Sequence, residues 1–178
     1  MTSRAPHHPS LRVACVLGLV HAAASAYWAA GGSWLVETVG QWAVDWRQES
    51  PGSAALVLTL VAAVKAAGAL VPLAVESGHL PGRRWWRAAS SAGAAVLVLY
   101  GTANTVGAWV GLAGLVDPSG PQDDAALWGH AVLWDPLFAC WGVTLALGLR
   151  ATRHATPEGP RGVASPRPAS RAARARPR

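Results

Sequence analysis

The sequence predicts an all-α polytopic membrane protein with four transmembrane helices in a bundle. Of its 178 residues, 52% are hydrophobic and only 13% are charged, a composition typical of membrane proteins. Four apolar stretches follow one another, and each is long enough to cross about 30 Å of hydrocarbon as a helix. These stretches are residues 11–30, 53–75, 90–112 and 126–149. Their apolar residues lie on all sides of the helix, which disfavours the alternative of a soluble helical protein.

Residues 1–10 form a short basic N-terminus, which we expect to be cytoplasmic, and the first predicted span, residues 11–30, follows directly. A cleaved signal peptide is the alternative interpretation, because small residues come after the apolar run. His21 and Tyr27 lie within this span, and Trp28 has the position of an interfacial anchor. We therefore expect the helix to be retained.

Residues 31–52 predict a short amphipathic helix on the outer membrane surface. Leu35, Val39 and Trp42 recur at helical spacing on one face, and polar residues occupy another. Such a helix lies in the interface with its tryptophans at the level of the headgroups. A tryptophan-rich interfacial loop is the alternative interpretation.

The second span, residues 53–75, carries a lysine near its middle. Lys65 and Pro72 are seven residues apart, about two helical turns, so they point to the same side. Pro72 has no N–H and leaves the carbonyl of Gly68 without its helical donor, so this carbonyl needs protein or water beside it. Both features predict that this face points toward the other helices.

One face of the third span, residues 90–112, combines polar and small residues. This face holds Tyr100, Asn104, Gly107 and Gly111 at helical spacing. A glycine pair four residues apart lets two helices approach closely, so we expect this face to contact a neighbouring helix.

The distribution of charge predicts that both termini lie in the cytoplasm. Arg83, Arg84 and Arg87 cluster in the turn before the third span, and arginine is enriched in cytoplasmic loops. Residues 117–124 carry three aspartates and no basic residue, as expected of an outer loop. Residues 150–178 cannot bury enough apolar surface to fold and are predicted to form a disordered basic tail. We expect membrane lipid as a partner, with anionic lipid in contact with this tail, and no nucleic acid.

One polar side chain from each span lies at nearly the same predicted depth. Counting about 1.5 Å per residue from the outer ends, His21, Asn104 and Asp135 lie about 12 to 13 Å deep. Lys65 lies about 18 Å deep, but its long side chain reaches upward. An isolated charge at the bilayer centre costs about 2.5–3.5 kcal/mol, so Asp135 needs a partner, and Lys65 is the best candidate. We therefore predict a buried polar layer of His21, Lys65, Asn104 and Asp135.

Further polar and aromatic side chains are placed to line this layer. They are Ser25, Tyr27, Tyr100, His130 and Trp134. His130 is five residues from Asp135, which in a regular helix turns the two side chains about 140° apart. We therefore place His130 at the outer mouth of the layer as a lining residue. The alternative is that Pro136 disturbs the turn containing Asp135 and changes this separation.

The layer allows a structural and a chemical interpretation. A buried Lys65–Asp135 ion pair would fix the register of two helices without doing chemistry. Alternatively, Lys65 or His21 exchanges protons with Asp135, since ionisable residues within a membrane commonly mark proton relays or substrate pathways. A haem held by His21 and His130, whose depths differ by about 7 Å, or a metal held by both and Asp135, is disfavoured, so we predict no metal and no cofactor.

Common enzyme motifs are missing from the sequence. It has no His-Glu-x-x-His zinc motif, no glycine-rich phosphate loop and no nucleophile elbow. Cys15 and Cys140 lie in apolar spans without Cys-x-x-Cys spacing, so we interpret them as small buried residues.

Three segments carry recognisable motifs. They are HAAASAYWAAGG at residues 21–32, TVG at 38–40 and GHAVLWDPLF at 129–138. With these motifs the chain resembles the bacterial membrane family called domain of unknown function 3995, over a transmembrane domain at about residues 11–149. The resemblance implies a four-helix protein of the bacterial cytoplasmic membrane without an assigned activity, so it supports the architecture and adds no reaction.

Three functions are compatible with these observations. In the first, the polar layer binds or moves a small or lipid-like ligand, with coupling to protons. In the second, the protein is a membrane enzyme acting on a lipophilic substrate, with His21, Lys65 or Asp135 as acid or base. In the third, it is a structural or partner-stabilising subunit locked internally by Lys65 and Asp135.

Overall fold

The computed structural model describes residues 8–116 and 122–153. Within these residues the chain is helical and has no strand, which confirms the predicted all-α fold. The segments are α1 (Pro9–Ala29), η1 (Val36–Val39), α2 (Gln41–Glu49), α3 (Pro51–Glu76), α4 (Arg83–Leu112), α5 (Asp124–Gly129), η2 (His130–Trp134) and α6 (Asp135–Ala151). η1 is a 3-10 helix and η2 a π-helix, and η2 joins α5 to α6 without interruption. The predicted tail lies outside the described residues from 154 onward, as does 117–121 of the predicted outer loop.

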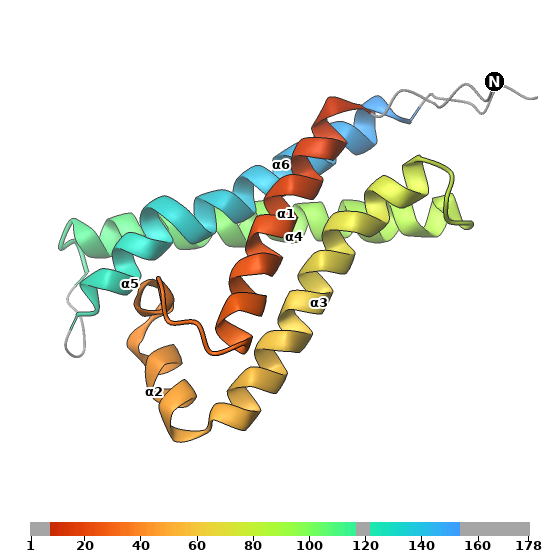
Figure 1. Ribbon diagram of the computed structural model, residues 1–178. Coiled ribbons are helices and arrows are strands. Elements are labelled where there is room, and N and C mark those ends of the chain that lie inside the picture. The colour runs from red at the N-terminus through yellow and green to blue at the C-terminus, as the bar shows by residue number, and fades with distance from the viewer. Residues whose placement is uncertain (1–7, 117–121, 154–178) are drawn as a thin grey trace, which may run out of the picture.

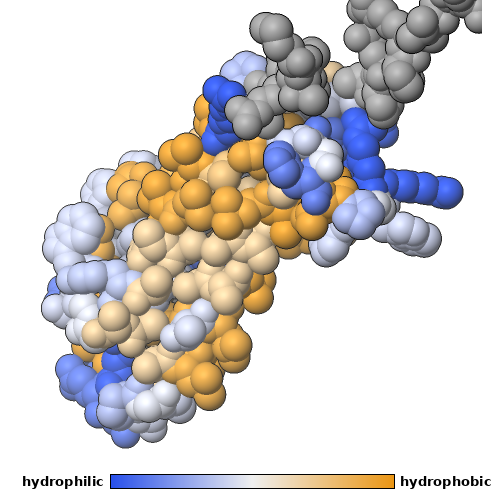
Figure 2. All heavy atoms as spheres, turned by 45° about the vertical axis from the view of Figure 1, so that its right-hand side comes forward, coloured by the Kyte–Doolittle hydropathy of each residue, from blue (hydrophilic) through white to orange (hydrophobic). Residues whose placement is uncertain are grey.

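Four helical stretches are long and apolar enough to cross a membrane, in agreement with the four predicted spans. They are Pro9–Ala29, Pro51–Glu76, Arg83–Leu112 and Asp124–Ala151. Figure 2 shows a largely apolar surface between hydrophilic side chains at opposite ends of the molecule. The length and composition of these helices indicate a membrane protein.

The central helices are α1 and α6. α1 packs between α3 and α6, and α4 packs against α6 (Figure 1). In the apolar windows of α1 and of the stretch that contains α6, 39% of the residues are buried, compared with 17% in α3 and 11% in α4. α3 and α4 therefore lie on the flanks, where they turn most of their apolar surface outward.

A helix is present in the region predicted to be amphipathic, residues 31–52, but α2 covers only Gln41–Glu49 of it. η1 ends at Val39 and α2 begins at Gln41. Gly40 between them has a φ of 135°, which suits glycine and not a larger residue. The expectation of one helical face running from Leu35 to Trp42 is therefore wrong, because the backbone changes conformation at Gly40.

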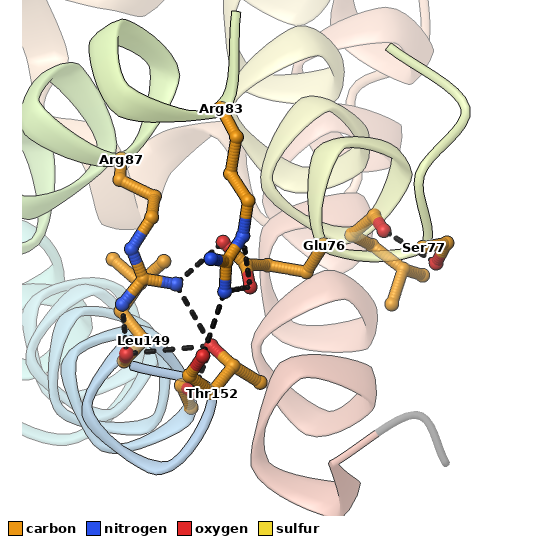
Figure 3. Close-up of polar contacts among 8 residues, drawn as sticks. Glu76, Ser77, Arg83, Arg87, Leu149 and Thr152 are labelled. Atoms are coloured by element: carbon orange, nitrogen blue, oxygen red, sulfur yellow. Dashed lines mark hydrogen bonds and ion pairs between the residues drawn. The ribbon is translucent and has the colours of Figure 1, made fainter. Parts of the chain in front are cut away.

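The arginine-rich turn belongs to α4 and joins the ends of three helices. Arg83 and Arg87 both bind the carboxylate of Glu76 at the end of α3, with N–O distances of 2.8 and 2.6 Å (Figure 3). Arg83 also donates to the carbonyl of Thr152 at 2.6 Å, while Arg87 donates to the Thr152 hydroxyl at 2.9 Å and to the carbonyl of Leu149. Because the last carbonyls of a helix lack intrahelical donors, the two arginines satisfy the end of α6 and tie it to α3.

Glycines allow α4 and α6 to cross closely. A Cβ atom on Gly101 of α4 would lie 2.5 Å from the carbonyl oxygen of Asp135 and 2.6 Å from the backbone nitrogen of Ala139. A Cβ atom on Gly142 of α6 would lie 2.7 Å from the carbonyl oxygen of Ala94. Only hydrogen fits at these two positions, so they set the distance between the helices.

The glycine pair that was expected to make this contact has a different environment. A Cβ atom on Gly107 would meet no atom within 4 Å, and one on Gly111 would meet the side chain of Leu127 of α5 at 3.2 Å. The spacing of the pair is helical, but the crossing with α6 lies at Gly101, so Gly107 borders open space instead.

Replacing Gly101 by alanine is expected to destabilise the protein by about 1–3 kcal/mol, because the added Cβ meets backbone atoms of α6 that cannot turn aside. Reversible unfolding in mixed detergent micelles measures the loss. The matched control is Gly93→Ala, also in α4, where a Cβ atom meets nothing within 4 Å. It gains helix propensity without a clash and should be at least as stable as the parent. Equal stability of both variants would contradict the close crossing.

Candidate functional site

Buried polar side chains gather where α1, η1 and η2 meet the start of α6. The side chains of His21, Ser25 and Asp135 are almost fully enclosed, with 2%, 1% and 1% of their residue surface exposed. Polar groups enclosed in this way must find hydrogen-bond partners within the protein. Their partners define the candidate site.

Asp135 is paired with His130. The ring Nδ1 of His130 lies 2.7 Å from Oδ2 of Asp135, and its Nε2 lies 3.2 Å from the carbonyl oxygen of Val39. The carbonyl only accepts, so Nε2 carries a hydrogen, and one further proton lies between Nδ1 and the carboxylate. The pair as a unit is therefore neutral wherever that shared proton resides.

The π-helical turn explains why this pair was not expected. In a regular helix five residues separate the two side chains by about 140°. η2 has the i→i+5 hydrogen-bond pattern of a π-helix, which brings His130 and Asp135 onto one side. The prediction that His130 lies away from Asp135 is therefore wrong. Pro136, which comes directly after Asp135, lacks the N–H needed to continue a regular ladder through this turn.

Lys65 has other partners than the one expected. Its Nζ donates to Oγ of Ser25 at 3.0 Å and lies 5.3 Å from the ring centroid of Phe138, within the range of a cation–π contact. No ion pair between Lys65 and Asp135 forms in the part of the chain that the structure describes. The expected pairing is wrong because the π turn directs the carboxylate to His130.

His21 links α1 to the π turn. Its Nε2 donates to the carbonyl of Trp134 at 3.1 Å, and its ring stacks on Phe138 with centroids 3.8 Å apart. Phe138 thus contacts both His21 and Lys65. The indole of Trp134 donates to Oγ1 of Thr38 at 2.9 Å, so η2 is bonded to α1 on one side and to η1 on the other.

Of the remaining predicted site residues, Tyr100 touches this network only through Phe138, and the hydrogen bonds of Asn104 and Tyr27 lie outside it. Asn104 donates to the carbonyl of Tyr100 in its own helix at 3.1 Å. The Tyr100 ring meets Phe138 edge-on, with centroids 5.8 Å apart. The hydroxyl of Tyr27 accepts from the backbone of Trp34 at 3.4 Å in an exposed position. Equal depth along four helices therefore placed His21 and Asp135 near one another, but it did not place Asn104 among them.

Asp123 is a polar residue of the site that the sequence analysis missed. One carboxylate oxygen accepts from the backbone of Ala126 at 3.0 Å and caps α5, and the other accepts from the backbone of Gln41 at 2.8 Å, where α2 begins. One side chain thus satisfies the starts of two helices. Its position just before an apolar helix is the usual signal of an N-cap.

Asp123 has a counterpart at the opposite end of the molecule. There Glu76 binds two arginines that in turn satisfy the end of α6. Both carboxylates bridge segments that are distant in the sequence. Helix ends are where backbone groups lack partners, so a charge placed there contributes more than the same charge on a helix side.

A cavity of about 380 Å³ opens beside His130, between α4 and α5. It is lined by Gly107, Gly111, Val116, Gln122, Asp123, Ala126, Leu127 and His130. The His130 side chain is 32% exposed, whereas Asp135 behind it is 1% exposed. The cavity therefore combines a mostly apolar wall with a single proton-holding pair, of which only the imidazole is accessible.

Comparison with known families agrees with the motifs around this site. A family model matches residues 18–145, more than half of the chain, which include every segment from η1 to η2. The chain belongs to the family described as "Protein of unknown function (DUF3995)". No curated protein and no solved structure matches it. Membership in DUF3995 confirms the predicted family and names no reaction.

No metal centre is assigned to this DUF3995 protein. Across residues 8–116 and 122–153, no three His, Cys, Asp or Glu side chains lie close enough together to hold a metal ion. The ionisable groups that the described residues bring together at the site are the His130–Asp135 pair, the His21 imidazole and the Lys65 amine.

His130→Ala is expected to lower the free energy of unfolding by about 3–5 kcal/mol, since it leaves the enclosed Asp135 without its partner. Asp135→Ala should cost less, because the His130 side chain that it leaves is 32% exposed. In a double-mutant cycle, His130→Ala with Asp135→Ala should lose much less than the sum of the single losses. Unfolding in mixed micelles measures all four forms.

The matched control cycle combines Lys65→Met with Asp135→Ala. These residues share no direct bond, so their losses should add within about 0.5 kcal/mol. Additive losses in the first cycle, or strong coupling in the control, would contradict the assigned pairing.

Proposed function

We propose that this protein is a multi-pass protein of the bacterial cytoplasmic membrane that binds a small or lipid-like ligand in the cavity beside His130. The observation that carries the proposal is the His130 imidazole, which is bonded to the enclosed Asp135 on one side and lines the 380 Å³ cavity on the other. Ligand sites in proteins typically measure about 300–1,000 Å³ and combine apolar walls with a few polar groups.

The lining favours a ligand with an apolar body and a polar end. Gly107, Gly111 and Leu127 offer an apolar wall, while Gln122 and His130 offer polar groups. The carboxylate oxygens of Asp123, which also line the cavity, already accept hydrogen bonds from two helix starts. His130 also has partners at both ring nitrogens, Asp135 at Nδ1 and the Val39 carbonyl at Nε2, and the contact at Nε2, at 3.2 Å, is the longer of the two. A polar end of the ligand therefore reaches His130 by taking the place of the Val39 carbonyl at Nε2.

The shared proton supports coupling between ligand binding and protonation. An anionic ligand stabilises a positive charge on His130, whereas a cationic ligand favours loss of the shared proton and a bare Asp135 carboxylate. An anionic ligand therefore draws the shared proton onto His130 without net proton uptake, whereas a cationic ligand releases a proton. A neutral ligand leaves the pair unchanged.

The other two functions have less support from the contacts. His21, considered as a catalytic base, is 2% exposed and its Nε2 is bonded to a carbonyl group. A structural role based on a Lys65–Asp135 ion pair has less support because Lys65 is bonded to Ser25 and Asp135 to His130. Binding beside His130 leaves its bond to Asp135 in place and replaces only the contact with the Val39 carbonyl.

The orientation we propose places the arginine-rich end and both termini in the cytoplasm. Of engineered cysteines at two exposed positions, Gln48→Cys in α2 should react with a membrane-impermeant maleimide on intact cells, and His79→Cys only after permeabilisation. Cys15 is buried, whereas Cys140 is exposed, contrary to the sequence interpretation, so both are replaced by alanine in the background. Labelling of His79→Cys from outside would overturn the orientation.

Ligand binding is tested by filling the cavity. Gly107→Leu places a side chain into open space that borders the cavity, so it should lower the amount of any co-purifying ligand at least tenfold without unfolding the protein. Mass spectrometry of organic extracts from protein purified in mild detergent measures the molar ratio. Gly93→Leu, in the same helix and equally unobstructed, is the control. An extract without a stoichiometric molecule, or one equally rich in both variants, would contradict the proposal.

A further inference from the structure

A second cavity, of about 530 Å³, lies between α4 and α6 at the arginine-rich end. Arg87, Arg150 and Arg153 line it at that end, and Ala95, Val98 and Leu99 continue its wall along α4. Leu99 lies twelve residues after Arg87, a rise of about 18 Å in a helix, which is slightly more than half of the roughly 30 Å hydrocarbon layer. The groove therefore has a charged end and an apolar length that match one leaflet of a membrane.

The charged end carries an excess of positive charge. Glu76 is bound to both Arg83 and Arg87, so one carboxylate serves two guanidinium groups. Arg150 and Arg153 are exposed, and neither takes part in an ion pair within the described residues. Two arginines at the mouth of the groove are thus available to an anion.

The wall of the groove is held in place before anything binds. The guanidinium of Arg87 reaches from α4 to the end of α6, where it binds the Leu149 carbonyl and the Thr152 hydroxyl (Figure 3). Gly142 keeps the same two helices close further along. Since the two sides are already fixed, little ordering is needed when an occupant enters.

We propose that this groove binds one anionic phospholipid, with its phosphate at Arg150 and Arg153 and an acyl chain along Ala95, Val98 and Leu99. An amphiphile fits because the apolar wall continues into the outward surface of α4, where Leu99 is 71% exposed. A free phosphate ion would use only the arginines. The site is separate from the cavity beside His130 and does not depend on the function proposed for it.

The test is native mass spectrometry of the full chain, titrated in detergent with phosphatidylglycerol and, for comparison, phosphatidylcholine. One phosphatidylglycerol should bind in preference. The variant Arg150→Gln with Arg153→Gln should bind it about 30-fold more weakly, which corresponds to about 2 kcal/mol for two arginines. Arg12→Gln with Arg84→Gln is the control, because it removes two exposed arginines of the same end that do not line the groove.

A second variant tests the apolar part of the groove with all charges kept. Ala95→Trp fills the wall and should weaken phosphatidylglycerol at least tenfold, whereas its neighbour Val96→Trp, which is 64% exposed and outside the lining, should not. An equal loss of phosphatidylglycerol affinity in the Arg150/Arg153 variant and in the Arg12/Arg84 control would indicate diffuse electrostatic attraction and would overturn the site. Unchanged binding in Ala95→Trp, or complete displacement by inorganic phosphate, would overturn the lipid as its occupant.

Discussion

The enclosed carboxyl group of Asp135 is the constraint on which the site depends. With 1% of its side chain exposed, it has to be satisfied from within the protein, and His130 does this at 2.7 Å. A regular helix cannot bring these two side chains together, so their pairing requires the π turn between them. The same turn presents the Trp134 carbonyl to His21 and the Trp134 indole to Thr38. The π turn that satisfies the Asp135 carboxyl group therefore also connects α1 and η1 to the start of α6.

Hydropathy predicted the four spans because length and apolar composition are properties of each segment alone. It also singled out His21 and Asp135, since polar residues in apolar spans stand out. It placed the start of the third span at residue 90, whereas α4 begins at Arg83, because a hydropathy window cannot include the arginines that bind Glu76. Helix boundaries at charged ends depend on partners elsewhere in the chain.

The hydrogen-bond partners within the site could not be predicted from the sequence, for two physical reasons. Depth along a helix gives one coordinate and leaves rotation open, so Asn104, at the right depth, bonds its own helix instead. Rotation was then inferred from a period of 3.6 residues, and the π turn changes that period between His130 and Asp135. Lys65 has a long side chain, and it contacts Ser25 and Phe138 rather than Asp135, the opposite charge that the estimate of depth placed nearest to it.

The π turn and the cavity belong together. An extra residue in a helical turn rotates the helix before the turn about its axis relative to the helix after it, so α5 presents a different face to α4 than a regular continuation of α6 would. The close packing of α6 on α4 requires glycine at Gly101, where α6 touches α4, while Gly107, two turns further along α4, borders open space. α5, which precedes the π turn, contacts α4 beyond this space, at Gly111. The proton-holding pair and the cavity that His130 lines thus meet at one departure from regular helix, and π-helical turns occur frequently at functional sites.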